Sequence, residues 1–256
     1  MILVDPSARP LIAHRGASAD APENTMEAFV LAAEQGCDAF ELDVRLSADG
    51  VPVVLHDPTL DRTTDRSGEV RSLTREEIQA ADAGAGHVKG DGTHPWRGRG
   101  VRVPALVELI RGFPDMPLLI EIKAPEAQHA VASLLVREGA VARAVVASFK
   151  ARALSAFRRA PFLLGSSRRD ILGMLARTRL GLGAPAHPCL CYAVPDFWKG
   201  RIEVPRSSFV AGAARRGKPV HVWTVDDPNR ARVLWGRGVC GIITNRPGVM
   251  VARTKY

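Results

Sequence analysis

Two acidic residues and a histidine within one short stretch carry the strongest chemical signal in the sequence. Residues 40–57 read FELDVRLSADGVPVVLHD, with alternating apolar residues on both sides of Asp49-Gly50. This pattern predicts a two-residue hairpin turn, because glycine adopts a positive φ without steric cost. Asp43 would then lie opposite His56, with Cβ atoms roughly 5 Å apart, and Glu41 would share the face of Asp43. Such a group is typical of a metal-assisted hydrolase, although a half-buried hairpin with a surface salt bridge would use the same residues.

Polar and aromatic residues also occur near the ends of three other strand-like runs. They are His14 and Arg15 in the run 11–16, Glu121 and Lys123 in the run 118–123, and Trp223 in the run 220–225. If these strands are parallel staves of one barrel, their carboxyl ends meet at a single rim. We therefore expect these side chains to gather beside the hairpin.

The three carboxylates of this rim, Glu41, Asp43 and Glu121, would raise one another's pKa unless a cation lay among them. A divalent metal ion removes that penalty. Ligand sets made only of oxygen favour Mg²⁺ or Ca²⁺ over softer metals. The sequence therefore predicts a divalent metal site.

The remaining rim residues suit a phosphate. Arg15 and Lys123 add positive charge, which together with a metal balances the charge that develops in phosphoryl transfer. His14 and His56 can act as general base and general acid across a phosphodiester. Structural roles also fit: a rim salt bridge for Glu121 and Lys123, and a core position for His14.

Other aromatic and basic residues have simpler interpretations. Trp223 could fill the core instead of lining a site. His221 lies two residues earlier on the same strand face and should sit deeper, so we interpret it as structural. The remaining histidines have no partners at useful spacing and are expected on the surface or in loops: His87, His94, His129 and His187.

The elements that must position the rim alternate as strand and helix along the chain. The length of 256 residues is typical of a (β/α)₈ barrel. Nine strand-like runs occur, and eight remain if 51–57 is only the return arm of the hairpin. We expect one TIM-barrel domain over 1–256, with the turn-rich and Gly-rich segment 58–103 inserted after the hairpin as a cap over one end of the barrel.

Two local predictions concern helices. Asn24 is expected to be the N-cap of a helix that ends at Gly36, with Glu27 completing a capping box. A second helix is expected over 150–159.

Composition limits the partners. The net charge of +8 suits an anionic small-molecule substrate, and without a nucleic-acid-reading motif no nucleic acid is expected. The four cysteines lack zinc-site spacing, and neither a signal peptide nor a membrane-spanning run is evident. We expect a reduced, cytoplasmic protein, with no indicated membrane contact; the pattern does not predict an oligomeric state.

At HRG, PENT, ELDV, DGVPVVLHD, LDRTT and EIK the sequence resembles the glycerophosphodiester phosphodiesterase family, from about Leu11 to Pro247. The resemblance implies a TIM barrel that hydrolyses a glycerophosphodiester to sn-glycerol 3-phosphate and an alcohol. The glycerol 2-hydroxyl would attack phosphorus, and water would open the cyclic phosphate. The implied roles are metal ligands at Glu41, Asp43 and Glu121, acid and base at His14 and His56, phosphate binding by Arg15 and Lys123, and substrate packing by Trp223.

Some segments depart from the family pattern and leave the alcohol open. Cys240 and Lys150 stand where acidic residues are common, the loop 84–100 is Gly-rich and basic, and 189–200 matches poorly. One alternative is a lysophospholipase D-like phosphodiesterase, whose basic loop and Trp96 would meet a lipid surface. Another is a non-catalytic phosphate-binding barrel, which would be expected to lack a histidine or carboxylate; none is missing.

Overall fold

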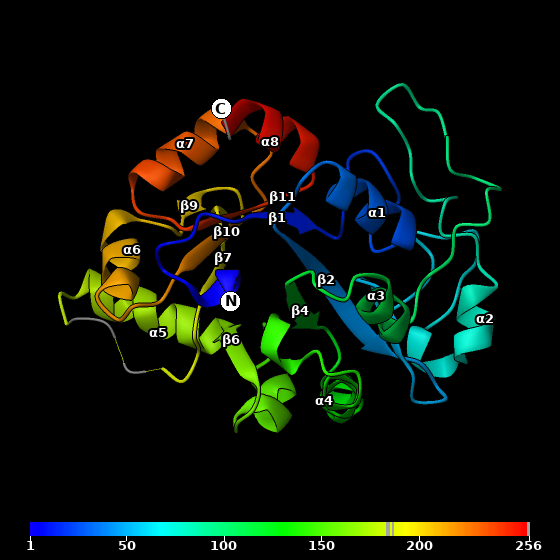
Figure 1. The fold of residues 1–256 in the computed structure, drawn as a ribbon, viewed down its shortest axis with the longest axis horizontal. Helices are drawn as coiled ribbons and strands as arrows, with labels where there is room; N and C mark the ends of the chain where they lie inside the picture. The colour runs from blue at the N-terminus through cyan, green and yellow to red at the C-terminus, as the bar shows by residue number, and fades with distance from the viewer. Residues whose placement is uncertain (183–184, 186, 255–256) are drawn as a thin grey trace.

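The computed structural model describes residues 1–182, 185 and 187–254. In this part of the chain, eight parallel strands stand in a ring, in the hydrogen-bonded order β6-β5-β4-β2-β1-β11-β10-β7 (Figure 1). They are β1 (Leu11–His14), β2 (Ala39–Leu46), β4 (Leu118–Ile122), β5 (Ala144–Ser148), β6 (Leu163–Ser167), β7 (Tyr192–Pro195), β10 (Val220–Trp223) and β11 (Gly241–Thr244). The predicted (β/α)₈ barrel is confirmed.

The ring is joined loosely at one place, between β6 and β7. The isolated bridge Gly165–Cys191 links these strands, and two further hydrogen bonds support it. Leu190 N donates to Leu164 O at 2.7 Å, and Ala193 N donates to Ser166 Oγ at 3.2 Å. The hydroxyl of Ser166 thus takes the place of a backbone carbonyl as hydrogen-bond acceptor between β6 and β7.

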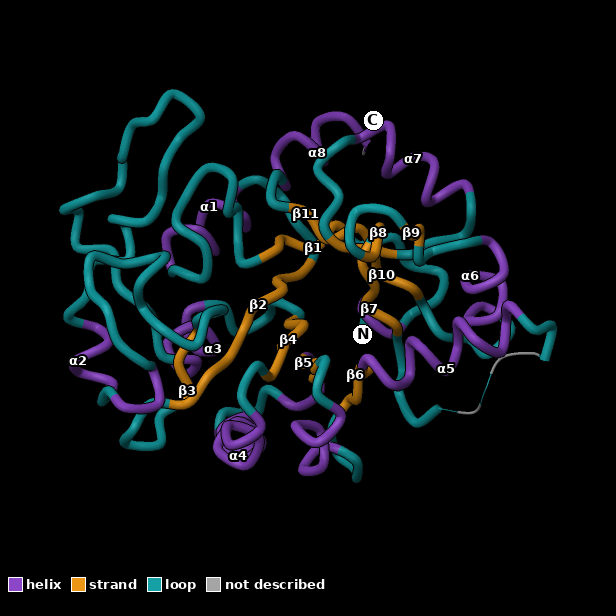
Figure 2. Tube along the Cα trace, turned by 180° about the vertical axis from the view of Figure 1, so that it is seen from behind, coloured by secondary structure: helices purple, strands orange, loops and turns teal. Residues whose placement is uncertain are grey.

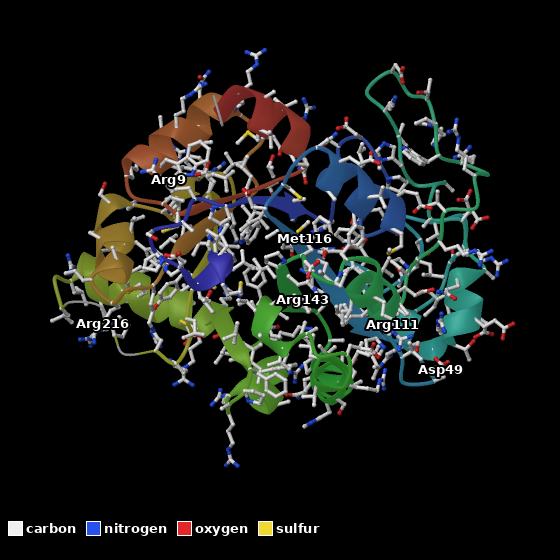
Figure 3. The ribbon with its side chains drawn as sticks, viewed as in Figure 1. Arg9, Asp49, Arg111, Met116, Arg143 and Arg216 are labelled. Carbon is white, nitrogen blue, oxygen red and sulfur yellow. The ribbon has the colours of Figure 1, made fainter. Side chains whose placement is uncertain are left out.

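Helices cover the outside of the ring (Figure 2). They are α1 (Met26–Glu34), α3 (Leu106–Gly112), α4 (Gln128–Arg137), α5 (Arg168–Arg179), α6 (Ser207–Ala214), α7 (Pro228–Gly236) and α8 (Pro247–Thr254). The 3₁₀ helices are η1 (Ile2–Val4), η2 (Val70–Ser72), η3 (Pro125–Ala127), η4 (Val141–Arg143) and η5 (Ala151–Phe157). Arg143, the last residue of η4, donates to the carbonyls of Met116 at 2.7 Å and of Ile110 in α3 at 2.8 Å. Figure 3 labels Arg143 and Met116.

Two helix predictions need correction. The segment expected as a helix over 150–159 is the 3₁₀ helix η5. The N-cap of α1 is Thr25, whose hydroxyl accepts from Ala28 N at 3.3 Å. Asn24 has a positive φ of 60° and turns its amide toward Asp43, because two hydrogen bonds to that residue compete with capping.

Small and branched side chains fill the inside of the barrel. Leu3, from η1, is fully buried among inward-facing residues that include Ile12, Val145 and Ile243. The first turn of the chain therefore packs into the ring, as its position in Figure 1 shows. His221 is fully buried beside it and bonds to Leu3 O at 2.8 Å, so its predicted structural role is confirmed. Burial lowers the pKa of His221 to about 4.

The hairpin after β2 has a different register from the predicted one. Val44 pairs with Val54 in β3 (Pro52–Val54), which leaves three loop residues, 48–50. Gly50 has φ +78°, as in a type I turn followed by a left-handed residue. Ser47 selects this loop, because its hydroxyl accepts from Val51 N at 2.9 Å. Asp43 therefore lies opposite Leu55, whose N donates to Asp43 O at 2.9 Å, and His56 follows beyond the pairing.

The inserted segment 58–103 packs against this hairpin. Its apolar cluster joins Val53 and Leu55 of the hairpin to residues such as Leu60, Ile78 and Val103. Helix α2 (Arg75–Gln79) begins after Thr74, which forms a capping box with Glu77. Arg75 N donates to Asp49 Oδ1 at 3.0 Å at the hairpin tip, a residue that Figure 3 labels beside this helix.

Candidate active site

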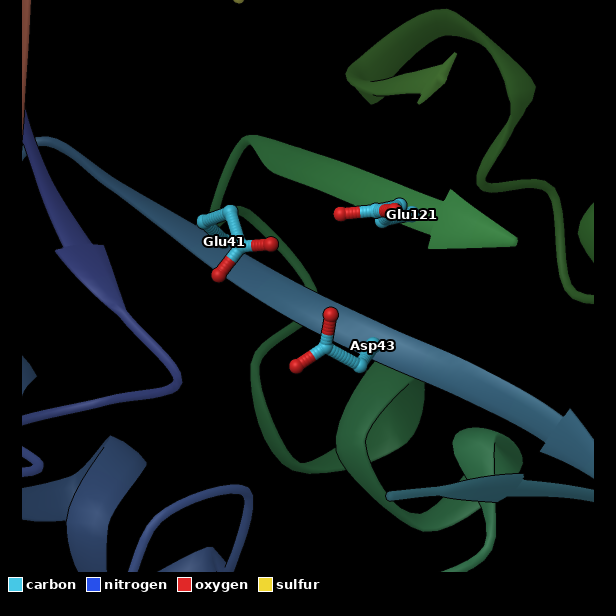
Figure 4. A group of neighbouring side chains, drawn as sticks. All are labelled: Glu41, Asp43 and Glu121. Atoms are coloured by element: carbon cyan, nitrogen blue, oxygen red, sulfur yellow. The ribbon is translucent and has the colours of Figure 1, made fainter. Parts of the chain in front are cut away.

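Strand register brings the three carboxylates together at the carboxyl ends of neighbouring strands. Glu41 pairs with His14 across β1 and β2, and Asp43 pairs with Glu121 across β2 and β4. One carboxylate oxygen of each acid lies within 4.8 Å of the others. Figure 4 shows the three side chains turned toward one another.

Burial makes this cluster electrostatically costly. It raises the pKa of Glu41 well above the ordinary value, and the nearby charge of Asp43 raises it further. Burial also raises the pKa of Glu121. In Asp43 burial acts in the same direction, but Lys123 and Arg15 outweigh it and hold the pKa below its usual range.

Two cations partly compensate the acids. Lys123 Nζ lies 3.0 Å from Asp43 Oδ1 and 2.8 Å from Glu121 Oε2. Arg15 Nε lies 2.8 Å from Asp43 Oδ2. Three carboxylates and two cations leave a formal charge of −1, which would repel an anionic phosphodiester.

The cluster fits a divalent cation. Such an ion would change the formal charge of the five groups from −1 to +1, which complements a phosphodiester anion. Among the described residues, Glu41 Oε2 is buried without a hydrogen-bond partner. The all-oxygen donor set suits a hard cation.

His14 is held by a chain of hydrogen bonds. Its Nδ1 lies 2.7 Å from Asn245 Oδ1, and Asn245 Nδ2 donates to Asp226 Oδ2 at 2.8 Å. Because that donation fixes the amide, Asn245 presents its oxygen and His14 Nδ1 carries the proton. His14 Nε2 is then the lone-pair nitrogen, 3.9 Å from Glu41 Oε2. Burial lowers the pKa of His14.

His56 has a charged partner instead. Its Nδ1 lies 2.5 Å from Asp57 Oδ1, and Arg62 Nε donates to Asp57 Oδ2 at 2.6 Å. Arg62 holds the pKa of Asp57 at about 2, so this carboxylate is ionised at neutral pH. Burial lowers the pKa of His56, while the charge of Asp43 and the bond to Asp57 raise it.

A cavity of about 120 Å³ opens among these groups. Seven of the eight predicted site residues line it: His14, Arg15, Glu41, His56, Glu121, Lys123 and Trp223. The eighth, Asp43, is fully buried beneath them. Trp223 packs edge-on against Phe149, with ring centroids 5.7 Å apart. The structure therefore brings all eight residues together.

Sequence reasoning missed several residues of the site. Asn24 donates to Asp43 at 3.0 Å, and Glu23 accepts from Arg15 at 2.9 Å; both stand in the PENT motif. Asn245 directly follows the end of β11, a position that the barrel rule marks as part of the rim. Phe149 and Arg168 also line the cavity, and both follow strand ends.

The other histidines lie outside this cavity. His94 bonds to Ala85 O at 3.2 Å within the inserted segment. His87 lines a separate cavity with Thr63 and Lys89. His187 was expected to lack a partner, but its Nδ1 lies 3.1 Å from Asp170 Oδ1. Asp170 lies in the first turn of α5.

A parallel barrel that carries paired histidines, an acid cluster and two cations at its carboxyl rim defines the class of phosphodiester-cleaving barrel enzymes. Residues 14–180 and 188–249 match the model of the glycerophosphoryl diester phosphodiesterase family. The chain belongs to this family and is a phosphoric diester hydrolase.

Relatives of known sequence or structure agree. The chain is 33% identical to a glycerophosphodiester phosphodiesterase from Caldanaerobacter subterraneus, over 94% of this chain and 96% of that protein. The glycerophosphoryl diester phosphodiesterase domain of an uncharacterized Mycobacterium tuberculosis protein superposes with a TM-score of 0.84 at 26% identity, over 97% of this chain and 99% of that one. An Oleispira antarctica phosphodiesterase, solved with its product sn-glycerol 3-phosphate, gives a TM-score of 0.77 at 25% identity, over 97% and 98% of the two chains.

Within the described part of the chain, every helix is too short or too polar to cross a bilayer.

Proposed function

We propose that this chain hydrolyses small glycerophosphodiesters to sn-glycerol 3-phosphate and an alcohol, using the rim residues described above. The observation that supports this most strongly is the pair of histidines lining one cavity beside the acid cluster. The product complex of the Oleispira antarctica relative is consistent with the same reaction.

In this proposal Glu41, Asp43 and Glu121 hold a divalent ion, Mg²⁺ or Ca²⁺. When bound, that ion supplies positive charge against the phosphate oxygens. Three carboxylates leave coordination positions for water and substrate oxygens, which both ions accept.

The chain's own side chains perform the remaining tasks. Arg15 and Lys123 orient the phosphate through its non-bridging oxygens. His14, neutral and with Nε2 unprotonated, accepts the proton of the attacking glycerol 2-hydroxyl. His56, stabilised as a cation by Asp57, donates a proton to the departing alcohol. Trp223 packs against the substrate and keeps water from that side of the cavity.

We further propose that residues 1–256 act as one unit, in the cytoplasm. Segment 58–103 would support the hairpin that carries His56. Its Arg62 joins Asp57 to Glu23 through bonds of 2.6 and 2.8 Å.

The proposal is tested with glycerophosphocholine in a coupled assay for sn-glycerol 3-phosphate. We expect Glu41→Gln to lower kcat by about 10²-fold or more, because a metal ligand and its charge are lost. Glu126→Gln, an exposed change after β4, is the matched control and should leave kcat unchanged. EDTA should abolish activity, and Mg²⁺ or Ca²⁺ should restore it.

Full activity of the wild-type chain in EDTA would overturn the metal role. Binding of sn-glycerol 3-phosphate by calorimetry, without turnover under any metal condition, would identify a non-catalytic barrel.

A further inference from the structure

A second, larger cavity adjoins the active site. Its volume is about 410 Å³, and it shares Phe149, Arg168 and Ile171 with the catalytic cavity. Helix α5 forms one wall. The small hairpin of β8 (Phe197–Trp198) and β9 (Ile202–Glu203) forms the other, and Figure 2 shows it next to β10. A ligand with its phosphate at the barrel rim can therefore extend into this groove without leaving the protein surface.

The walls of the groove are mostly apolar. Leu175 and Trp198 line it together with Leu172 and Ile202, whose residues are 53% and 56% exposed. Single exposed apolar residues are ordinary, but two that line one groove beside the half-buried Leu175 and Trp198 mark a binding surface for apolar groups.

Charge around the groove favours an anionic ligand. Residues 168–206 contain seven Arg or Lys and three Asp or Glu, a net charge of +4, half that of the whole chain. Arg168 stands between the two cavities, with its guanidinium carbon 5.0 Å from the centre of the Trp198 ring. The groove therefore combines an apolar floor with a cation at the end nearest the phosphate site.

The same walls include a segment in which the sequence departs from the family pattern, residues 189–200. Asp196 N donates to Trp223 O at 2.7 Å, which fixes the base of the β8–β9 hairpin to the active-site strand β10. The hairpin is thus positioned by the site that it borders.

We propose that this groove binds the hydrocarbon chain of a single-chain lysophospholipid while its phosphodiester occupies the catalytic cavity. The proposal rests on the proposed function and narrows its substrate class. Continuity with the catalytic cavity favours the chain of the substrate itself over a separate protein partner.

The chemistry is the same for this substrate. A 1-acyl lysophospholipid retains its 2-hydroxyl, whose oxygen forms a bond to phosphorus as its proton passes to His14. The bond from phosphorus to the head-group oxygen breaks, and that oxygen takes a proton from His56. Water then opens the cyclic phosphate. The net reaction converts lysophosphatidylcholine and water to 1-acylglycerol 3-phosphate and choline.

The test measures choline release from glycerophosphocholine and from 1-acyl lysophosphatidylcholines with six- to twelve-carbon chains, each below its micelle concentration. We expect kcat/KM to rise by roughly tenfold or more over this series, because methylene groups leave water. Leu172→Gln with Ile202→Gln should remove most of that rise and leave glycerophosphocholine hydrolysis unchanged. Val233→Gln, an exposed apolar change on α7, is the matched control.

A kcat/KM that is independent of chain length, or a rise that the double variant retains, would overturn the groove proposal while leaving the proposed function intact. Co-sedimentation of wild-type protein with anionic vesicles, without a chain-length effect on monomeric substrates, would also overturn it in favour of a surface-docking role. If the wild-type chain hydrolyses neither substrate, the proposed function fails instead.

If the wild-type chain hydrolyses neither substrate, a binding measurement still tests the groove. Dodecylphosphocholine below its micelle concentration should change the tryptophan fluorescence of the wild-type chain, and Trp198→Phe should remove most of the change. Binding that persists unchanged in the Leu172 and Ile202 double variant would place the hydrocarbon chain elsewhere and overturn the groove proposal.

Discussion

The two histidines of the site stand in different surroundings. His14 lies on a barrel strand, and its Nδ1 meets a neutral amide that Asp226 orients. His56 lies on the return arm of the hairpin, and its Nδ1 meets the ionised carboxylate of Asp57. A neutral partner favours neutral imidazole, whereas an anionic partner favours imidazolium. The fold thus prepares one histidine to receive a proton and the other to give one.

The largest effect is expected when each imidazole ring is removed in turn. We expect His14→Asn and His56→Asn each to lower kcat on glycerophosphocholine by roughly 10²- to 10⁴-fold. The two variants should differ with a p-nitrophenyl ester of glycerol 3-phosphate, whose leaving group needs no proton. His56→Asn should recover most of its activity on that ester, and His14→Asn should not.

Steady-state kinetics on both substrates would measure the difference. His129→Asn, in α4, serves as the control because it lies outside the site. Equal recovery of the two variants would mean that the acid and base roles are not divided as described.

A smaller loss of kcat should follow from weakening the hydrogen bonds that orient His14. Asp226→Asn leaves every ring in place but removes the acceptor that orients Asn245. The amide can then rotate and offer its NH₂ group, which favours the opposite imidazole tautomer. We expect kcat to fall by roughly tenfold to a hundredfold, by analogy with other residues that orient an active-site histidine.

Nitrogen chemical shifts of His14 in labelled protein would report the tautomer. An unchanged tautomer together with a lowered kcat would assign Asp226 a different role.

The smallest effect concerns pH. The bond to Asp57 raises the pKa of His56 against the lowering by burial, so Asp57→Asn should lower that pKa further. If protonated His56 is the acid, the alkaline limb of the kcat profile falls as this proton is lost, and the limb should move to lower pH in the variant. Activity above the limb should drop severalfold.

A full pH profile measures this shift, and Asp61→Asn, an exposed neighbour, provides the comparison. A limb that moves to higher pH, or stays in place, would contradict the assignment of His56 as acid.

The sequence predicts the barrel and its rim because both depend on simple periodicity. Alternation of strands and helices determines the number of staves, and barrel geometry places every strand's carboxyl end at the same rim. Glu41, Asp43, Glu121 and the cations therefore meet as expected. The strand register of the hairpin is harder to predict, because Asp-Gly occurs in both two-residue and three-residue hairpin loops. Here the hydroxyl of Ser47, which accepts from Val51 N, favours the three-residue loop.

The supporting residues are harder to predict for another reason. Asn24 fits the pattern of a helix cap, and only the position of Asp43 in space shows that its amide has a better partner. Asn245 and Asp226 come from different strand ends, and their hydrogen bond appears only once β10 and β11 are adjacent. Residues that orient a site residue through a hydrogen bond have no characteristic spacing along the sequence, so the sequence pattern does not reveal them.

The junction of β6 and β7, which has few hydrogen bonds, is where we expect the barrel to open most easily for a bulky substrate. These two strands share one bridged residue pair, whereas every other neighbouring pair described in the ring shares two or more, so we expect local opening to cost the least free energy there. Helix α5 follows β6 directly, so separation of β6 from β7 would widen the passage between the catalytic cavity and the apolar groove. Amide protons of β6 and β7 should accordingly exchange with solvent deuterium sooner than those of β2 and β4.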